Sequence, residues 1–417
     1  MASANRIYYA VQAVQMQGVN GPGIDGSPED VGAFRSVFGV QSVGISTNFN
    51  LENVFQLGEF DQYDVLDDNP EIEVTLNKII DYTDPLYVLA CGGAASTPST
   101  TGKNVLEVAS RRCNVRLFVG SDVNHQNVTG ALPFVVKMTG MYLSSISYTF
   151  ATDGNFTEEA TLVGNNKVWY NNSDSVSNNA TTGDQIHPVA GTTTAFNNLR
   201  ATGVARRWNI DLANSILPSG TTSWDGGIVL PHDGQNFVVP HITNLTVSCD
   251  LGREPLFQLG SRAPYTRFVN VPLEVTSEFE VIATEHDVSA SDFLTSGACA
   301  ANTRNLQPRE IYLRLCGPSA GDSNSGTKGM NFYLGKNNRL TSVNYSGGDT
   351  GGGNVTVTYS YTGYNTFYVD QGAKITVASA PYNGRGYNTC GRTASGLNGT
   401  VSFSAGSPAA NTTGSST

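Results

Sequence analysis

The sequence predicts a mainly β protein built from two duplicated β-sandwich domains, each with one short flanking helix. Two observations support this fold class. Only 14% of the 417 residues are charged and 45 are Gly, a composition typical of short strands joined by turns. In addition, Phe55-Gln56-Leu57-Gly58 returns as Phe257-Gln258-Leu259-Gly260. The distance between the copies, 257 − 55 = 202 residues, is about half of the chain.

The residues around this repeat keep the same spacing. Tyr63 corresponds to Tyr265, and Pro70 corresponds to Pro272. Upstream, alternating apolar positions also correspond, with Val43, Ile45 and Phe49 falling on Leu245, Val247 and Leu251. Because side chains alternate between the two faces of a strand, this pattern indicates that the same strand face is buried twice. We interpret the repeat as an internal duplication.

The duplication divides the chain into three parts. The first β-sandwich domain and its linker occupy residues 1–198, and the second domain occupies 199–370. Residues 371–417 have no counterpart and end in a Gly, Ser and Thr-rich segment. The boundary is expected within 171–200, because that stretch is polar and has no apolar period.

Alternation of apolar and polar residues predicts the strands. In the first half they are expected over residues 6–15, 33–49, 71–80, 114–120, 141–150 and 155–163. A loop is expected over 18–30. A short helix is expected near 84–91, because Asp84 can cap it and Pro85 suits its first position. In the second half the same order predicts strands at 207–213 and 340–345, and a helix near 289–296.

The net charge and the spacing of the cysteines limit the classes of function that the sequence allows. The 24 Lys and Arg against 35 Asp and Glu give a net charge of −11. An acidic chain is poorly suited to gripping nucleic acid phosphates, but it suits a surface past which a polyanion slides. The six cysteines include no CxxC pair, so neither zinc nor another cofactor is expected. No secretory signal and no membrane-length apolar run is recognised.

Catalytic motifs are not found in the sequence. There is no GxSxG motif, no P-loop and no HExxH motif. No two of the five histidines have metal-ligand spacing: His125, His187, His232, His241 and His286. A cluster of acids suggests calcium at Asp61, Asp64, Asp67, Asp68 and Glu71, but the EF-hand order is absent. A solvated acidic loop is the expectation, and an enzyme is not expected.

The two long loops after the repeated motif, 58–70 and 260–272, differ in charge. Loop one carries Glu59, Asp61, Asp64, Asp67 and Asp68, whereas loop two carries Arg262 and Arg267 and no acid. We hypothesise that these loops contact neighbouring subunits and that the opposite charges fix the pairing. The alternatives are that each loop is simply solvated, or that it packs through Phe60, Tyr63 and Tyr265.

The order of these motifs resembles the major tail tube protein of tailed bacteriophages, in the form with two fused tube domains. The resemblance rests on a strand ending in Phe-Gln-Leu-Gly, a long loop with Tyr, a Pro before a Glu-Val-Thr strand, a short helix and a late hairpin. It covers most of residues 1–370. It implies sandwich domains whose inner sheets close into a ring β-barrel on oligomerisation.

The resemblance also implies a function and partners. The protein would be a structural virion protein, assembled in the host cytoplasm, whose homotrimeric rings of pseudo-sixfold symmetry stack into a tube. The tube would deliver the DNA genome, which passes through the lumen without specific contacts. Other partners would be tail proteins such as the terminator, the tape measure and, in a contractile tail, the sheath.

Two alternatives stay open. One is a glycan-binding or host-binding β-sandwich module of a phage tail or capsid, for which the aromatic candidates are Tyr345, Tyr359, Tyr361 and Tyr364. The other is a tube protein of a type VI-like injection system, which would share the fold and differ in cargo.

Overall fold

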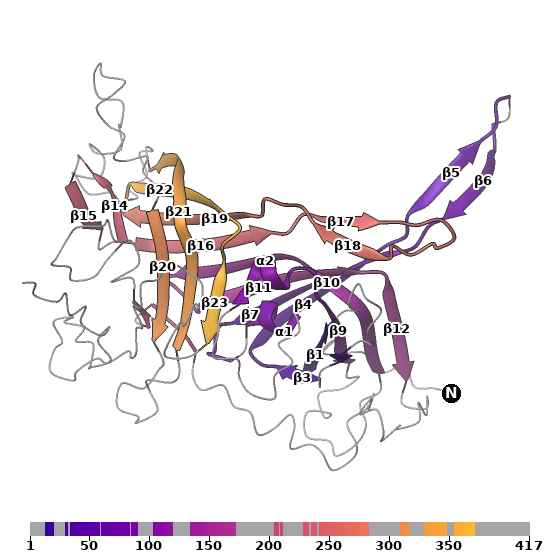
Figure 1. Ribbon diagram of the computed structural model, residues 1–417, viewed down its shortest axis with the longest axis horizontal. Helices are drawn as coiled ribbons and strands as arrows, with labels where there is room; N and C mark the ends of the chain where they lie inside the picture. Colours follow the sequence, from indigo (N-terminus) through magenta and orange to yellow (C-terminus); the bar gives the residue numbers. More distant parts are fainter. Residues whose placement is uncertain are drawn as a thin grey trace, which may run out of the picture.

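The computed structural model is mainly β, and the strand pairings among its described residues are antiparallel (Figure 1). It describes residues 13–20, 30–31, 34–58, 60–83, 85–90, 103–119, 134–171, 204–207, 209–211, 228–232, 235–239, 242–282, 309–316, 329–347 and 354–371.

The first half of the chain contributes twelve of the described strands and two short helices. The strands are β1 (Ala13–Asn20), β2 (Asp30–Val31), β3 (Arg35–Val37), β4 (Val40–Asn48), β5 (Leu51–Phe55), β6 (Gln62–Asp67), β7 (Glu71–Ile79), β8 (Lys103–Asn104), β9 (Arg112–Val119), β10 (Phe134–Ala151), β11 (Thr157–Gly164) and β12 (Asn166–Asn171). The helices are α1 (Leu86–Ala90) and α2 (Val105–Val108).

The second half contributes strands only among its described residues. They are β13 (Ile210–Asp211), β14 (Ile228–His232), β15 (Gln235–Val239), β16 (Ile242–Asp250), β17 (Arg253–Leu256), β18 (Thr266–Val269), β19 (Glu274–Ile282), β20 (Arg309–Cys316), β21 (Gly329–Ser346), β22 (Thr356–Tyr364) and β23 (Tyr368–Gln371).

One long sheet joins the two halves. Its strand order is β4–β7–β11–β10–β16–β19–β22–β21. The halves meet where β10 pairs with β16, so the sheet crosses from one half to the other without interruption. Because these pairings form an open row, the described sheet does not close on itself within the chain. β4 stands at one end of the row and the carboxyl-terminal part of β21 at the other.

A second layer covers one face of this sheet in each half. In the first half it has the order β12–β10–β9–β1, with β2 and β3 on β1. In the second half the order is β13–β20–β21–β23. β10 and β21 are 18 residues long and belong to both layers. β8 of the first half pairs with β23, so the halves are also joined in this layer.

Alternation explains why these segments form half-buried strands. In β7, Ile72, Val74 and Leu76 are buried while Glu73 on the other face is exposed. α1 has five residues, too few for a helix to be stable alone. It persists because Leu86 and Leu89 are buried in the core. α2 is capped at its amino end by Asn104, whose side chain accepts a hydrogen bond from the Leu106 amide.

One hydrophobic cluster spans both halves. The Tyr148 ring packs edge-on against Phe332, with centroids 4.8 Å apart, and Phe150 packs against the same ring at 5.3 Å. The Tyr87 hydroxyl donates to the Val369 carbonyl at 2.9 Å. The side chains of one half therefore complete the core of the other, and the halves are not separate hydrophobic units.

The strand order of the first half returns in the second. β4 and β16 have nine residues each, as do β7 and β19, and β10 and β21 have 18 each. The ladders also correspond, because Asn48 pairs with Glu71 as Asp250 pairs with Glu274. That the halves superpose as two duplicated sandwiches remains a prediction.

Several sequence expectations need correction. β1 runs to Asn20 and enters the segment expected to be a loop. Both long loops are wrong as loops, because loop one contains β6, which pairs with β5, and loop two contains β18, which pairs with β17. α1 starts at Leu86, later than expected, and α2 was not expected.

Other expectations fall on residues outside the described ranges. They are the helix near 289–296, the boundary segment 172–203, the cap Asp84 and the carboxyl-terminal segment 372–417.

Candidate assembly surfaces

Two long hairpins extend from the sheet. Arm one is β5 with β6, residues 51–67, and arm two is β17 with β18, residues 253–269. Figure 1 shows arm one pointing away from the body, while arm two extends from the second half along the first. The tips turn at Gly58 and Gly260, with φ angles of +93° and +87°. Such angles favour glycine, which explains why both repeats end in this residue.

The registers of the two arms match at a shift of 202 residues. Leu51 lies opposite Asp67 in arm one, and Arg253 lies opposite Val269 in arm two. The sequence repeat and the ladder therefore give the same alignment. It places the three arginines of arm two at three apolar positions of arm one: Arg253 at Leu51, Arg262 at Phe60 and Arg267 at Val65.

The arginines of arm two anchor it to the first half of the same chain. Arg253 Nε donates to the Leu143 carbonyl at 2.6 Å, and its guanidinium lies 5.3 Å from the Tyr142 ring centroid. Arg262 Nη2 donates to the Asp67 carbonyl. Arm two is thus fixed within the chain at its base and near its tip.

Arg267 makes the strongest of these anchors. Its Nη1 lies 2.8 Å from Glu71 Oε1, and its Nη2 donates to Asn165 Oδ1 at 3.2 Å. The Arg267 side chain is only 5% exposed. A charged hydrogen bond at a mostly buried guanidinium contributes more than an exposed ion pair, so this contact helps to hold the halves together.

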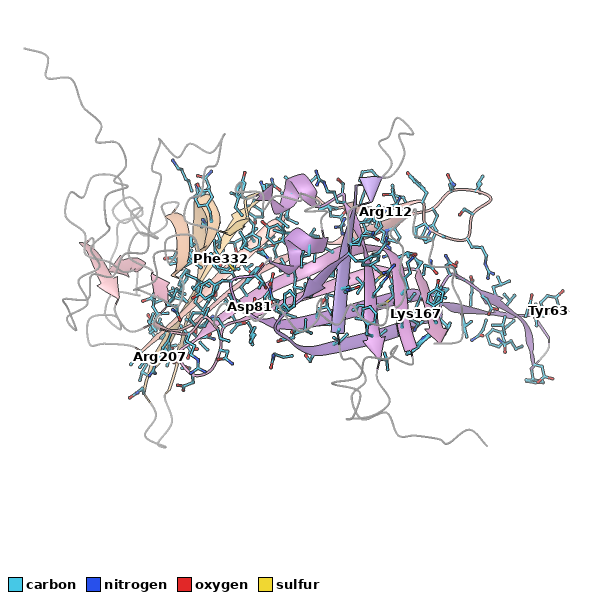
Figure 2. All side chains as sticks on the ribbon, turned by 90° about the horizontal axis from the view of Figure 1, so that it is seen from below. Tyr63, Asp81, Arg112, Lys167, Arg207 and Phe332 are labelled. Carbon is cyan, nitrogen blue, oxygen red and sulfur yellow. The ribbon has the colours of Figure 1, made fainter. Side chains whose placement is uncertain are left out.

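Arm one is tied to arm two at its base, because the Asp67 carbonyl accepts the hydrogen bond from Arg262. Its apolar side chains are largely exposed, namely Leu51, Phe55, Leu57, Phe60, Tyr63, Val65 and Leu66. Tyr63 lies at the far end of the arm in Figure 2. An exposed apolar set of this size marks an interaction surface.

The predicted contact residues fall on these two arms. Asp61, Tyr63, Asp64, Asp67 and Asp68 are exposed on or beside arm one, and Tyr265 is exposed on arm two. Glu59 lies outside the described residues. Within the chain, Arg262 meets the backbone of Asp67, and Arg267 pairs with Glu71 rather than with one of the predicted acids.

The long sheet has one buried face and one polar face. A row of residues crosses seven strands of the polar face in register, consisting of Ser42, Asn77, Glu159, Ser147, Ser248, Thr276 and Thr362. Glu73 and Glu278 on the same face are exposed. Within β7, β11, β16, β19 and β22 this face carries no Lys or Arg, because Lys78 of β7 points into the core. On β21, the exposed Arg339 lies opposite Thr362 and continues the row with a cation.

The two ends of the sheet are also unusual. At the junction inside the chain, Tyr148 of β10 lies opposite Val247 of β16, and both are buried with 0% exposure. By ladder position, Tyr345 of β21 corresponds to Tyr148 and Ile45 of β4 corresponds to Val247. Tyr345 is 49% exposed and Ile45 is 37% exposed. The outer strands therefore present the same residue types that are buried at the junction inside the chain.

Several buried polar groups of the first half form hydrogen bonds and an ion pair within the interior. Lys78 Nζ lies 3.2 Å from Asp81 Oδ1 and donates to Thr83 Oγ1 at 2.7 Å. Glu158 accepts hydrogen bonds from the Leu86 amide and from the Tyr148 hydroxyl, both at 2.7 Å. Burial raises the pKa of Glu158 and outweighs the attraction of Lys78 and these hydrogen bonds. This network ties α1 to the sheet.

The described part of the chain offers no cluster of three His, Cys, Asp or Glu side chains suited to a metal ion. Burial, with a smaller effect of Asp250, raises the pKa of the Cys249 thiol to about 12. Cys113 is buried as well, and buried thiols are unreactive. In the described ranges, no helix is long and apolar enough to cross a membrane.

Sequence reasoning found the arms and missed the outer strands. The repeated motif identified the arm tips, and the charge difference identified the arginines of arm two. The exposure of Ile45 was not found, and Tyr345 was considered only as a glycan-binding aromatic, because both lie in alternating strands that look like core strands. The sequence signal was available in the duplication, since each residue has a counterpart at the internal junction.

Comparisons with known proteins identify no family. No protein-family model matches the chain, and no curated protein sequence matches it. Among solved structures, a chain in the cryo-EM structure of the anti-feeding prophage (AFP) baseplate, 6-fold symmetrised, is similar at 9% identity and a TM-score of 0.24. The match covers 41% of this chain and 96% of that chain. Similarity at this level does not establish a shared fold, so the function proposed below rests on the geometry.

Proposed function

We propose that the protein is a structural virion protein, the major tail tube subunit of a tailed bacteriophage. In this proposal its rings stack into a tube through which the DNA genome is delivered into the host cell. The observation that carries the proposal is the long sheet, which already joins two related halves edge to edge and presents matching outer strands at its ends.

The internal junction supplies a pattern for the contact between copies. β10 pairs with β16 inside the chain, and the corresponding strands are β21 and β4. Pairing β21 of one copy with β4 of the next would place Tyr345 opposite Ile45, as Tyr148 lies opposite Val247. Such head-to-tail contacts join unlike surfaces, so they form a closed ring when the rotation between copies permits. Closure also covers sheet edges that would otherwise aggregate.

The resemblance described above implies rings of pseudo-sixfold symmetry, and a ring of three chains would satisfy it. Each chain supplies two halves, so three chains supply six. The polar face would line the lumen, where Glu73, Glu159 and Glu278 would repel phosphates and let DNA slide. The predicted contact residues of loops one and two, which lie on or beside the two arms, would contact neighbouring copies. Terminator, tape measure and sheath proteins would be the other partners, and the protein would reside in the virion after assembly in the host cytoplasm.

The glycan-binding alternative has less support. Of its four aromatic candidates, Tyr359 and Tyr361 are buried in the core. Tyr345 and Tyr364 are exposed, but ladder positions put them on opposite faces of the sheet. They therefore do not form one aromatic platform. A type VI-like injection tube would use the same assembly surfaces, so it differs from the proposal in cargo and in partners.

The test is electron microscopy of the purified protein together with mass measurement of its rings. The expected result is rings of three chains and stacked tubes. Discrete monomers at high concentration would contradict the proposal and favour the binding module, and rings of six chains would contradict the trimer.

A further inference from the structure

We propose that arm one docks on the second half of a second copy of this chain through apolar contacts. The docking surface corresponds to the surface of the first half on which arm two docks through its arginines. The inference rests on the proposed function, because it requires copies arranged head to tail. It assigns a partner surface to arm one and a chemistry that differs from that of arm two.

The starting point is the correspondence of the two arms. Arg253 and Arg267 lie on one face of arm two, because their cross-strand partners Val269 and Pro255 are in register. Leu51 and Val65 lie on the corresponding face of arm one, opposite Asp67 and Asn53. Corresponding faces of the two arms therefore differ in chemistry. Arm two carries cations on this face, and arm one carries apolar side chains.

Exposure shows that only one of these faces is already covered. Arg267 is 5% exposed, whereas Val65 at the corresponding position is 42% exposed. Leu51 and Phe60 are also exposed. Apolar side chains at positions where the related arm makes contacts are best explained by a covering surface. No described residue covers these side chains, and the duplication points to a second copy of the chain as the covering surface.

The second half of another copy supplies the corresponding surface. Arm two contacts the Leu143 carbonyl and Glu71, and the ladder counterparts of these residues are Leu340 and Glu274. Leu340 lies on β21 at the outer end of the sheet, and Glu274 lies on β19, which β22 separates from β21. If β21 of one copy pairs with β4 of the next, arm one of the next copy extends over them. The register of the sheet thus brings the arm to its docking surface.

The chemistry predicts how the contact responds to salt. Contacts made by Leu51, Phe60 and Val65 bury apolar area and depend little on ionic strength. Contacts of the kind made by Arg267 are electrostatic, and where they are exposed they weaken with salt. Arm one should therefore hold copies together at high salt, while the arginine contacts of arm two act inside each chain.

The first experiment measures ring association by analytical ultracentrifugation at several salt concentrations. The wild-type protein should associate equally well or better at high salt. The variant Leu51→Ser/Val65→Ser should associate at least roughly tenfold more weakly than the wild type, because two apolar contacts are lost at each junction. The control is Leu66→Ser, an exposed apolar residue on the opposite face of the same arm, which should leave ring association unchanged.

A second variant tests the docking surface itself. Leu51→Arg/Val65→Arg copies the anchors of arm two, and the surface offers Glu274 and the Leu340 carbonyl as acceptors. This variant should associate at low salt and lose association as salt rises. A loss at every salt concentration would contradict the equivalence of the two docking surfaces. Thermal unfolding of each variant should match the wild type, because these side chains are exposed in the monomer.

The outcomes separate this inference from the function on which it rests. Wild-type rings together with normal association of Leu51→Ser/Val65→Ser would overturn the inference and leave the tube function standing. Strong weakening of the wild-type rings by salt would also overturn it. The absence of rings and tubes from the wild-type protein would instead refute the proposed function.

Discussion

Tyr148 donates its hydroxyl hydrogen to Glu158 across the buried face of the sheet, at a distance of 2.7 Å. Tyr148 lies on the strand that joins the two halves, and Glu158 also accepts the amide hydrogen of Leu86 at the start of α1. A single buried carboxyl group thus connects the internal junction to the helix. Its protonation should influence the stability of both.

The first prediction concerns the pH dependence that Glu158 causes. Burial raises its pKa above the ordinary value of 4.5, so the folded state binds this proton more tightly than the unfolded chain. The resulting stabilisation is complete below about pH 4.5 and is lost as the pH rises through the raised pKa. Glu158→Gln keeps the acceptor oxygen and cannot ionise. The free energy of unfolding of the wild type, relative to this variant, should therefore fall as the pH rises.

Urea unfolding of both proteins at several pH values checks this. Glu159→Gln is the control, because Glu159 is exposed on the polar face and should change the pH profile little. Parallel pH profiles for the wild type and Glu158→Gln would show that burial does not raise the pKa of this carboxyl group.

The second prediction concerns the two ends of the sheet. Ile45→Lys and Tyr345→Lys each place a charge at a position whose counterpart at the internal junction is buried. Each variant alone should fail to form rings, because burying an unpaired charge is unfavourable. Each still has one intact outer strand, so an equimolar mixture should form a dimer with one copy of each. Native mass spectrometry measures this composition.

The matched control is Val168→Lys on β12, an exposed residue of a strand that pairs with β10 and not with β4 or β21. Its rings should form normally. Rings formed by either edge variant alone, or a mixture that stays monomeric, would argue against head-to-tail pairing of β21 with β4.

The third prediction concerns the polar face. Glu159→Lys/Glu278→Lys replaces two acids with cations on the surface proposed to line the lumen. Tubes of this variant should retain DNA and release it as salt rises, because each neutralised phosphate releases counterions. Wild-type tubes should retain little DNA. A filter-binding assay over a salt series measures the difference.

Asp153→Lys/Glu254→Lys changes the charge by the same amount outside the polar face, and both residues are exposed. If this control binds DNA as strongly as Glu159→Lys/Glu278→Lys, the total charge of the protein matters and the polar face has no special role.

The sequence by itself determined most of the strand content, because alternation of apolar and polar residues is local, and it determined the repeat, because identical residues recur at one offset. The alternation of Ile72, Val74 and Leu76 predicts β7 directly, and the correspondence of Leu57 with Leu259 locates both arms. β6 was missed although Tyr63 and Val65 alternate in it. The surrounding acids made the segment look like a solvated loop.

The tertiary structure decided how these strands are joined. Whether β10 pairs with β16, and whether Arg267 meets Glu71, depends on residues about 100 to 200 positions apart. Periodicity along the chain contains no information on such partners, because every half-buried strand presents a similar edge. Folding selects one arrangement by burying the shared core. That choice leaves Ile45 and Tyr345 exposed at the ends of the sheet and arm one without a surface to cover it.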